Sequence, residues 1–183
     1  MITLICGPMF SGKSTELIRQ LERKHIAGKR VLYVRPNADS RDFIARGYKG
    51  DLSDKADIKE VSQFTSELVK EMVQNYDAIF VDEYFMIKDC NLLCKELPED
   101  GHKCDIYFGG LLATAENTVW PETVSILPYC DDIVKLNAVC VSCGSDHGSY
   151  SLFKGGKDTS LVIGDDTYMA VCRKCYKRIV GHL

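Results

Sequence analysis

The most chemically specific stretch of the sequence is residues 7–14, which read G-P-M-F-S-G-K-S and satisfy the pattern G-x-x-x-x-G-K-[ST]. Glycines in such a loop let backbone N–H groups turn toward one phosphate, and the helix that follows adds its positive end. Lys13 would reach the β- and γ-phosphates, and the Ser14 hydroxyl would bind Mg²⁺. An apolar run at 2–6 precedes the motif, and 14–27 carries apolar residues at helical spacing. We therefore predict a phosphate-binding loop rather than a chance glycine turn.

A phosphate-binding loop needs an acid that helps to hold the magnesium ion, and two acids in the sequence can supply it. Asp82 and Glu83 directly follow the apolar run 78–81. Asp82 would hold the Mg²⁺ shell, and Glu83 would accept the proton of an attacking hydroxyl. The alternative is a pair of solvated acids that open a turn, which the neighbouring phosphate motif disfavours.

Four of the nine cysteines have the spacing of a metal site. They form two C-x-x-C pairs, Cys140 with Cys143 and Cys172 with Cys175. Two such pairs complete a tetrahedron around Zn²⁺, and four protein ligands leave no open position, so the zinc would be structural. Redox pairs or coincidence are the alternatives. The other five are read as small, buried or half-buried thiols in a reducing compartment: Cys6, Cys90, Cys94, Cys104 and Cys130.

The order of elements predicts an α/β fold. The predicted strands are 2–6, 31–34, 78–81, 106–108 and 132–136, and the predicted helices are 14–27, 64–74 and 91–97. Strands that are apolar on both faces and alternate with helices indicate a parallel sheet covered by helices. The motifs follow strands, at the edge where ligands bind. We expect a P-loop NTPase-like domain at 1–137 and a zinc ribbon with a long loop at 138–183.

Composition narrows the class of protein. With 45% hydrophobic residues, the 183-residue chain can bury a core. The net charge of −3 argues against a broad basic face for nucleic acid. No apolar run approaches the ~20 residues of a membrane span, and the first residues do not read as a signal peptide, so we expect a cytoplasmic protein. A basic tail favours a solvated ribbon surface over nucleic-acid contact; it contains Lys154, Lys157, Arg173, Lys174, Lys177 and Arg178.

Taken in order, the motifs resemble one known family. The string G-P-M-F-S-G-K-S-T-E-L resembles the phosphate loop of the zinc-containing thymidine kinases. Further matches are Asp39-Ser40-Arg41, Val81-Asp82-Glu83, Gly110-Leu111 with Thr114, Lys135-Leu136, Ala138-Val139-Cys140, and Tyr168 with Val171-Cys172-Arg173-x-Cys175. The resemblance covers nearly the whole chain.

The resemblance implies ATP as the phosphoryl donor and Mg²⁺ and structural Zn²⁺ as cofactors. Glu83 would be the general base for the 5′-hydroxyl of a pyrimidine deoxynucleoside, with thymidine as the expected substrate. The implied ATP and phosphate contacts are Gly7, Pro8, Met9, Phe10, Ser11, Gly12, Lys13, Ser14, Thr15 and Arg41. Members of this family usually assemble as tetramers, so a homotetramer is implied.

The resemblance also implies a nucleoside site under the ribbon loop. Met9 and Ser151 would lie near the base, Tyr168 would close on the nucleoside, and Trp120 stands where the family has a phenylalanine. Backbone groups of the loop would bind the pyrimidine edge; they belong to Leu161, Val162, Ile163 and Gly164.

Departures from the family pattern gather around this nucleoside site. Tyr84-Phe85-Met86 replaces A-Q-F, Ala115 replaces the phenylalanine of G-T-F, and Glu116 replaces the following glutamine. They leave two alternatives open, a changed nucleoside specificity and a nucleotide sensor without turnover. A third alternative, a P-loop ATPase that nucleic acid stimulates through the ribbon, is disfavoured by the acidic net charge.

Overall fold

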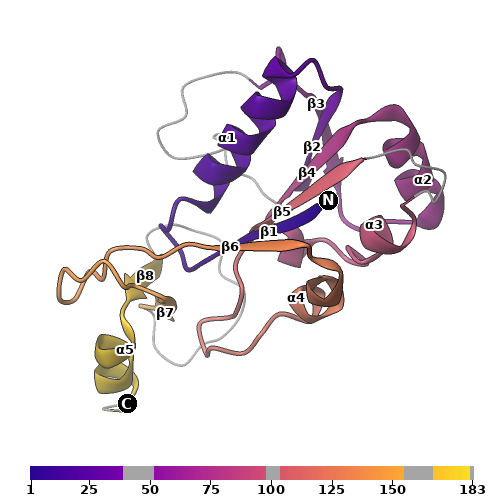
Figure 1. The fold of residues 1–183 in the computed structure, drawn as a ribbon. Helices are drawn as coiled ribbons and strands as arrows, with labels where there is room; N and C mark the ends of the chain where they lie inside the picture. Colours follow the sequence, from indigo (N-terminus) through magenta and orange to yellow (C-terminus); the bar gives the residue numbers. More distant parts are fainter. Residues whose placement is uncertain (39–51, 98–103, 155–166, 182–183) are drawn as a thin grey trace.

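The computed structural model, which describes residues 1–38, 52–97, 104–154 and 167–181, is built on one six-stranded sheet (Figure 1). The strand order is β3-β2-β4-β5-β1-β6, and every neighbouring pair is parallel. The bounds are β1 Ile2–Cys6, β2 Val31–Pro36, β3 Asp57–Val61, β4 Ala78–Asp82, β5 Asp105–Gly110 and β6 Asp132–Lys135. This arrangement confirms the predicted parallel α/β sheet.

Burial differs between the centre and the edges of the sheet. All five residues of β1 and all five of β4 are buried, whereas β3 and β6 are mostly exposed. The expectation of strands that are apolar on both faces therefore holds only for the central strands. β3 escaped prediction because its sequence, D-I-K-E-V, has the polar character of an edge strand.

One long helix covers one face of the sheet. Helix α1 (Lys13–Ile26) buries Leu17, Ile18 and Leu21 against the sheet, which confirms the helical spacing seen in the sequence. The helix ends before Gly28, whose φ of 70° is the left-handed conformation that glycine adopts after a helix.

Shorter helices cover the opposite face (Figure 1). They are α2 (Ser66–Asn75), α3 (Leu92–Lys95) and α4 (Pro121–Ile126). Helix α2 begins at Thr65, whose hydroxyl accepts a hydrogen bond from the Leu68 N–H at 3.3 Å. Helix α3 is shorter than the predicted 91–97. The sequence did not predict α4, a short helix with a proline in its first turn.

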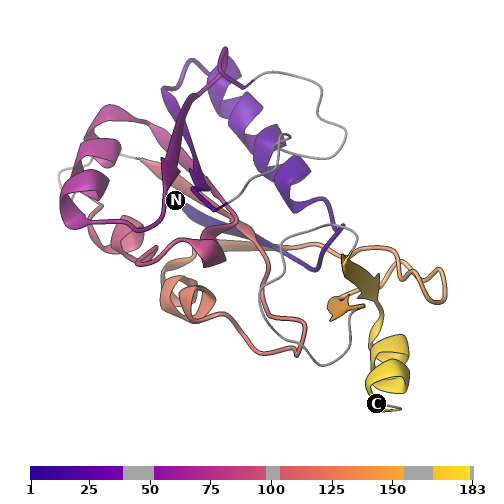
Figure 2. The same ribbon diagram turned by 180° about the vertical axis from the view of Figure 1, so that it is seen from behind.

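The C-terminal segment forms a separate small unit of secondary structure. Strands β7 (Tyr150–Phe153) and β8 (Tyr168–Val171) pair antiparallel, and α5 (Arg173–Val180) follows. Figure 2 shows these elements together at one end of the molecule, on the side where β1 runs into the phosphate loop. Among the described residues, no helix has the length and apolar character needed to cross a membrane.

Candidate functional site

The predicted phosphate loop lies between β1 and α1. Each of its two glycines is required for a different structural reason. A Cβ atom on Gly7 would lie 2.5 Å from the Leu136 carbonyl oxygen and 2.6 Å from the Ser11 hydroxyl, so no side chain fits there. Gly12 has a φ of 82° and caps the N-terminus of α1. The loop therefore turns tightly and places the positive end of a 14-residue helix at its base.

The lysine of the loop folds back onto the loop itself. Lys13 is buried, and its Nζ donates a hydrogen bond to the Pro8 carbonyl oxygen at 2.7 Å. The Ser11 hydroxyl donates to the same oxygen at 2.9 Å. Phe10, with a φ of 65°, and Thr15 face solvent at the rim. The ammonium group of Lys13 is thus held inside the loop, where a phosphate would need it.

Asp82 lies at the end of β4, opposite the phosphate loop. Its side chain is only 2% exposed, and its Oδ1 lies 3.4 Å from the Ser14 hydroxyl. The structure therefore brings together the two residues predicted to bind magnesium. The Tyr33 hydroxyl on β2 donates to Asp82 Oδ2 at 2.7 Å and orients the carboxylate. Sequence reasoning missed Tyr33, since a tyrosine within an apolar strand gives no sign of such a role.

Glu83 begins a sharp change of chain direction. Its backbone is left-handed, with φ 47° and ψ 44°, and the 3₁₀ turn Tyr84–Met86 follows it. Its N–H donates to Asp82 Oδ1 at 3.0 Å. A non-glycine residue in this conformation costs about 1–3 kcal/mol, and such strain gathers at functional sites. The half-buried Glu83 thus stands beside Asp82 at the carboxyl edge of the sheet.

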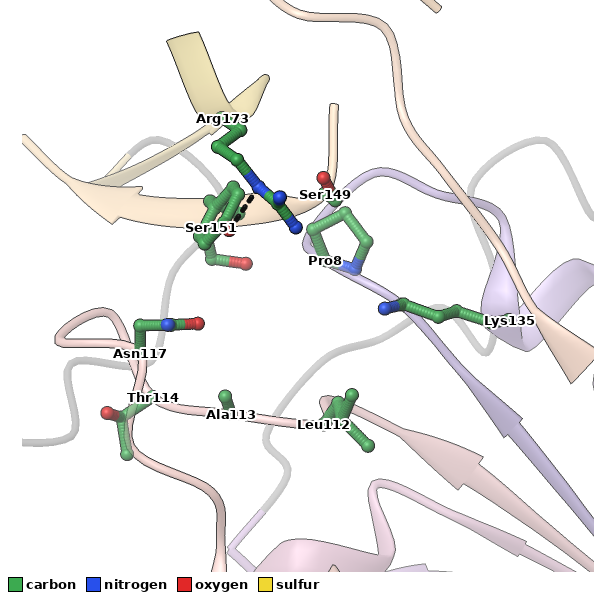
Figure 3. A pocket seen from close by; sticks show the side chains of 11 residues that line it. Pro8, Leu112, Ala113, Thr114, Asn117, Lys135, Ser149, Ser151 and Arg173 are labelled. Atoms are coloured by element: carbon green, nitrogen blue, oxygen red, sulfur yellow. Dashed lines mark hydrogen bonds between the residues drawn. The ribbon is translucent and has the colours of Figure 1, made fainter. Parts of the chain in front are cut away.

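A cavity of about 110 Å³, lined by polar and apolar groups, lies beside the phosphate loop (Figure 3). Of the predicted site residues, its lining includes Gly7, Pro8 and Ser151. The rest of the lining was not predicted as part of the site: Leu112, Ala113, Thr114, Asn117, Lys135, Ser149, Tyr150 and Arg173. Most of these residues lie in loops or at the ends of elements, so periodicity in the sequence gives no signal for them.

Ser151 joins the C-terminal segment to the phosphate loop. Its hydroxyl is buried in β7 and accepts a hydrogen bond from the Met9 N–H at 2.9 Å. Near this contact, the rings of Tyr150 and Tyr176 stack with centroids 4.6 Å apart. The Tyr176 hydroxyl donates to the carbonyl oxygen of Ala115 at 3.4 Å. Met9 and Ser151, both predicted near the base, are therefore neighbours.

The two predicted aromatic contacts lie in different places. Trp120 stacks on Phe85 with centroids 5.0 Å apart, and its buried Nε1 has no hydrogen-bond partner among the described residues. Tyr168 is half-buried in β8, with its ring 5.4 Å from that of Phe153. Five other predicted site residues lie outside the described residues: Arg41, Leu161, Val162, Ile163 and Gly164.

The four predicted metal ligands converge on one point. The sulfur atoms of Cys140, Cys143, Cys172 and Cys175 all lie within 4.8 Å of one another. The Sγ atoms of Cys143 and Cys172 are 3.8 Å apart. Tetrahedral Zn–S bonds of ~2.3 Å require sulfur atoms about 3.8 Å apart. The donor set and its spacing fit a closed zinc site.

The environment of this cluster lowers the pKa of Cys140 and of Cys172, whereas hydrogen bonds with the neighbouring thiols raise the pKa of Cys143. Burial alone would raise the pKa of Cys140, but hydrogen bonds from the backbone at Cys172 and Ser142 outweigh it and lower the pKa to about 6. A zinc ligand must be a thiolate, so the lowered pKa of Cys140 favours metal binding at that position. By contrast, burial raises the pKa of Cys94 and of Cys104 to about 12, as expected for inert thiols.

Comparison with known proteins points to one family. The family model described as "Thymidine kinase" matches residues 1–176. A "Thymidine kinase" of Acanthamoeba polyphaga mimivirus is 31% identical over 95% of this chain and 80% of its own length. "Thymidine kinase 1" of Dictyostelium discoideum is 32% identical over 96% of this chain and 77% of its own. A "Thymidine kinase" of Pseudothermotoga lettingae is 29% identical over 98% of this chain and 96% of its own length.

Proposed function

Because the chain belongs to the thymidine kinase family, we propose that it transfers the γ-phosphoryl group of ATP to the 5′-hydroxyl of thymidine. The observation that carries this proposal is the edge of the sheet where a phosphate loop, a buried aspartate and a strained glutamate meet. Phosphoryl transfer depends mainly on positioning and charge neutralisation, and this edge offers groups suited to both.

The phosphate loop would hold ATP through its backbone. In this proposal, N–H groups of residues 7–15 surround the β- and γ-phosphates. The Lys13 ammonium exchanges the Pro8 carbonyl oxygen for phosphate oxygens. Ser14 and Asp82 would hold Mg²⁺, which would neutralise charge on the phosphates, and the Tyr33 hydroxyl keeps Asp82 in place. The 3.4 Å between Ser14 and Asp82 supports this assignment.

Glu83 would act as the general base. It accepts the proton of the 5′-hydroxyl as that oxygen attacks the γ-phosphorus, and Arg41 steadies the phosphoryl group in transfer. The position of Glu83, one residue beyond the magnesium acid, supports this role, because it places the base close to the metal and the phosphates.

The nucleoside would lie under the long loop of the C-terminal segment, on the side of the phosphate loop where Met9 lies. Met9 and Ser151 support this placement, since they meet where the two parts join. Trp120, Tyr168 and the backbone of 161–164 would complete the site. In the same proposal, 1–137 is the ATP-binding domain, and 138–183 is a ribbon whose zinc fixes the base of the covering loop.

The wider setting is also part of the proposal. We propose a cytoplasmic homotetramer that supplies thymidine monophosphate for DNA synthesis from salvaged nucleoside. Nucleic acid is not among the expected partners, because the net charge is −3.

Transfer of ³²P from [γ-³²P]ATP to a panel of nucleosides tests this function. The panel holds thymidine, deoxyuridine, deoxycytidine, deoxyadenosine and deoxyguanosine, and the expected product is labelled thymidine monophosphate. Glu83→Gln should remove most of the transfer, whereas Glu71→Gln, at an exposed acid on α2, serves as the matched control. Transfer to no nucleoside would contradict the proposal, and tight binding without transfer would favour the sensor.

A further inference from the structure

We infer that the cavity between the phosphate loop and the C-terminal segment is a second anion site, which binds a single phosphate group apart from ATP. Two cations line it from different parts of the fold. Lys135 ends β6, and Arg173 begins α5. Figure 3 shows the ammonium group of Lys135 and the guanidinium group of Arg173 both directed toward the Pro8 wall of the cavity.

No negative charge in the described structure offsets these two cations. The lining contains no carboxylate, and no described acid forms an ion pair with Lys135 or Arg173. Arg173 Nε donates to the Tyr150 hydroxyl at 3.2 Å, which fixes the base of the guanidinium group and leaves its terminal nitrogens toward the cavity. Two cations without a counter-charge favour a dianion such as a phosphate over a neutral ligand.

A third polar group stands on the opposite wall. The side-chain amide of Asn117 extends from the loop after β5 toward the cavity (Figure 3). Leu112 and Ala113 close the floor with apolar atoms. A phosphate would therefore meet cations on one side, an amide on the other, and a surface that excludes water below.

The size of the cavity decides how much of a ligand it can hold. Pockets for whole drug-sized ligands measure about 300–1,000 Å³. This cavity, at about 110 Å³, accepts a phosphate group but not a nucleotide. The ligand is thus inorganic phosphate or the terminal phosphate of a larger ester whose remainder stays outside.

The cavity borders the phosphate loop through Gly7 and Pro8 but lies away from Glu83. In the strand order β4-β5-β1-β6, Glu83 follows β4, whereas Lys135 ends β6, with two strands between them. A phosphate that bridges Lys135 and Arg173 would hold the C-terminal segment against the sheet. The Met9–Ser151 hydrogen bond lies beside this bridge, so the anion would stabilise the phosphate loop on the side of Gly7 and Pro8.

Calorimetric titration of inorganic phosphate tests the site. The zinc-loaded protein is first saturated with Mg²⁺ and β,γ-imido-ATP, so that the phosphate loop is filled. We expect one phosphate to bind per chain. Lys135→Gln and Arg173→Gln should each weaken its binding about tenfold, the effect of losing one charge-assisted hydrogen bond. Lys174→Gln, which removes an exposed lysine beside Arg173 but outside the cavity, is the matched control and should not change the affinity.

A parallel titration with ribose 5-phosphate distinguishes the two sources of the phosphate. Binding of either ligand that both cavity substitutions weaken supports the site, and the tighter ligand identifies the source. Zinc content is measured for each variant, and Arg173→Lys, which keeps the charge, should retain more affinity than Arg173→Gln. Absence of binding by both ligands, or affinities that neither substitution changes, would overturn the inference. The readout needs no turnover, so it stands whether or not thymidine is phosphorylated.

Discussion

The phosphate edge and the C-terminal segment are held together by different forces. The loop that would bind ATP rests on fully buried strands and on a helix whose apolar stripe packs against them. The buried cluster of the C-terminal segment is much smaller, and most of it is cysteine: Cys140, Leu152, Val171, Cys172 and Cys175. Apolar burial is enough to form the first region, whereas the second buries little apolar surface, so we expect it to depend on a metal held by its four cysteines.

The two regions nevertheless share a boundary of direct contacts. The Met9 N–H donates to Ser151, and the Tyr176 hydroxyl donates to the carbonyl oxygen of Ala115. Unfolding of the C-terminal segment should therefore weaken nucleoside binding while the sheet remains folded. The predictions below test this difference, in order of the free energy at stake.

Loss of zinc should have the largest effect and should be confined to the C-terminal segment. The free energy of zinc binding to structural sites in small peptides is about 10–16 kcal/mol, and it stabilises the folded state. In Cys172→Ser, or after chelation, we expect amide hydrogens of 167–181 to exchange freely while those of β4 stay protected. Hydrogen exchange with mass spectrometry measures this, and Cys94→Ser, outside the cluster, is the control. Equal loss of protection in β4 would show that the two regions fold as one.

Glu83→Gln should lower kcat by about 10²–10⁴, the usual contribution of a general base. The substitution keeps the size of the side chain, so the thermal unfolding temperature should change little. Steady-state kinetics and a melting curve measured on the same preparation separate the two effects. A fall in kcat that matches a fall in stability would mean that Glu83 is structural.

Tyr33→Phe should weaken the magnesium site without removing it. The buried hydrogen bond to Asp82 is charged, and such bonds contribute about 1.5–3 kcal/mol. We expect the variant to need more Mg²⁺ for half-maximal rate, by about tenfold or more. Tyr129→Phe, at an exposed tyrosine, is the control, and an unchanged Mg²⁺ requirement would argue against the role of Tyr33.

The smallest expected effect is on stability at the amino edge of the sheet. Burial alone would raise the pKa of Asp105, but hydrogen bonds from Lys24 and the Met1 ammonium group outweigh it and lower the pKa. A lowered folded pKa stabilises the protein above the unfolded value of about 3.9, and this contribution is lost as the pH falls through the folded pKa.

Asp105→Asn should therefore reduce the free energy of unfolding by about 1 kcal/mol at pH 7. The difference from the wild type should shrink as the pH falls below about 4. Urea unfolding at both pH values measures it. A difference that persists unchanged in acid would show that the substitution disturbs packing rather than charge.

The sequence predicted those parts of the candidate site in which the functional residues are close together in the chain. The phosphate loop is one continuous string, and its flanking strand and helix have clear periodicity. Asp82 and Glu83 follow a strand directly, and each cysteine pair has the C-x-x-C spacing of a metal site. In each case local residues decide the structure, so the sequence is enough.

The parts that could not be predicted depend on distant segments meeting. Tyr33 reaches Asp82 only because β2 and β4 are neighbours, although 49 residues separate the two side chains. Lys135 and Arg173 line one cavity only because α5 docks near the end of β6. The edge strand β3 was missed because its polar, partly exposed sequence lacks the apolar pattern that marks a strand.

A single-turnover experiment with excess enzyme tests the central claim most directly. Wild-type protein, Lys13→Ala and Glu83→Gln are each mixed with [γ-³²P]ATP, Mg²⁺ and thymidine, and the labelled products are separated. The account predicts that the wild type transfers the label to thymidine monophosphate, while both variants, still folded, leave it on ATP. Label released as inorganic phosphate with no labelled thymidine monophosphate, or equal transfer by all three proteins, would contradict it.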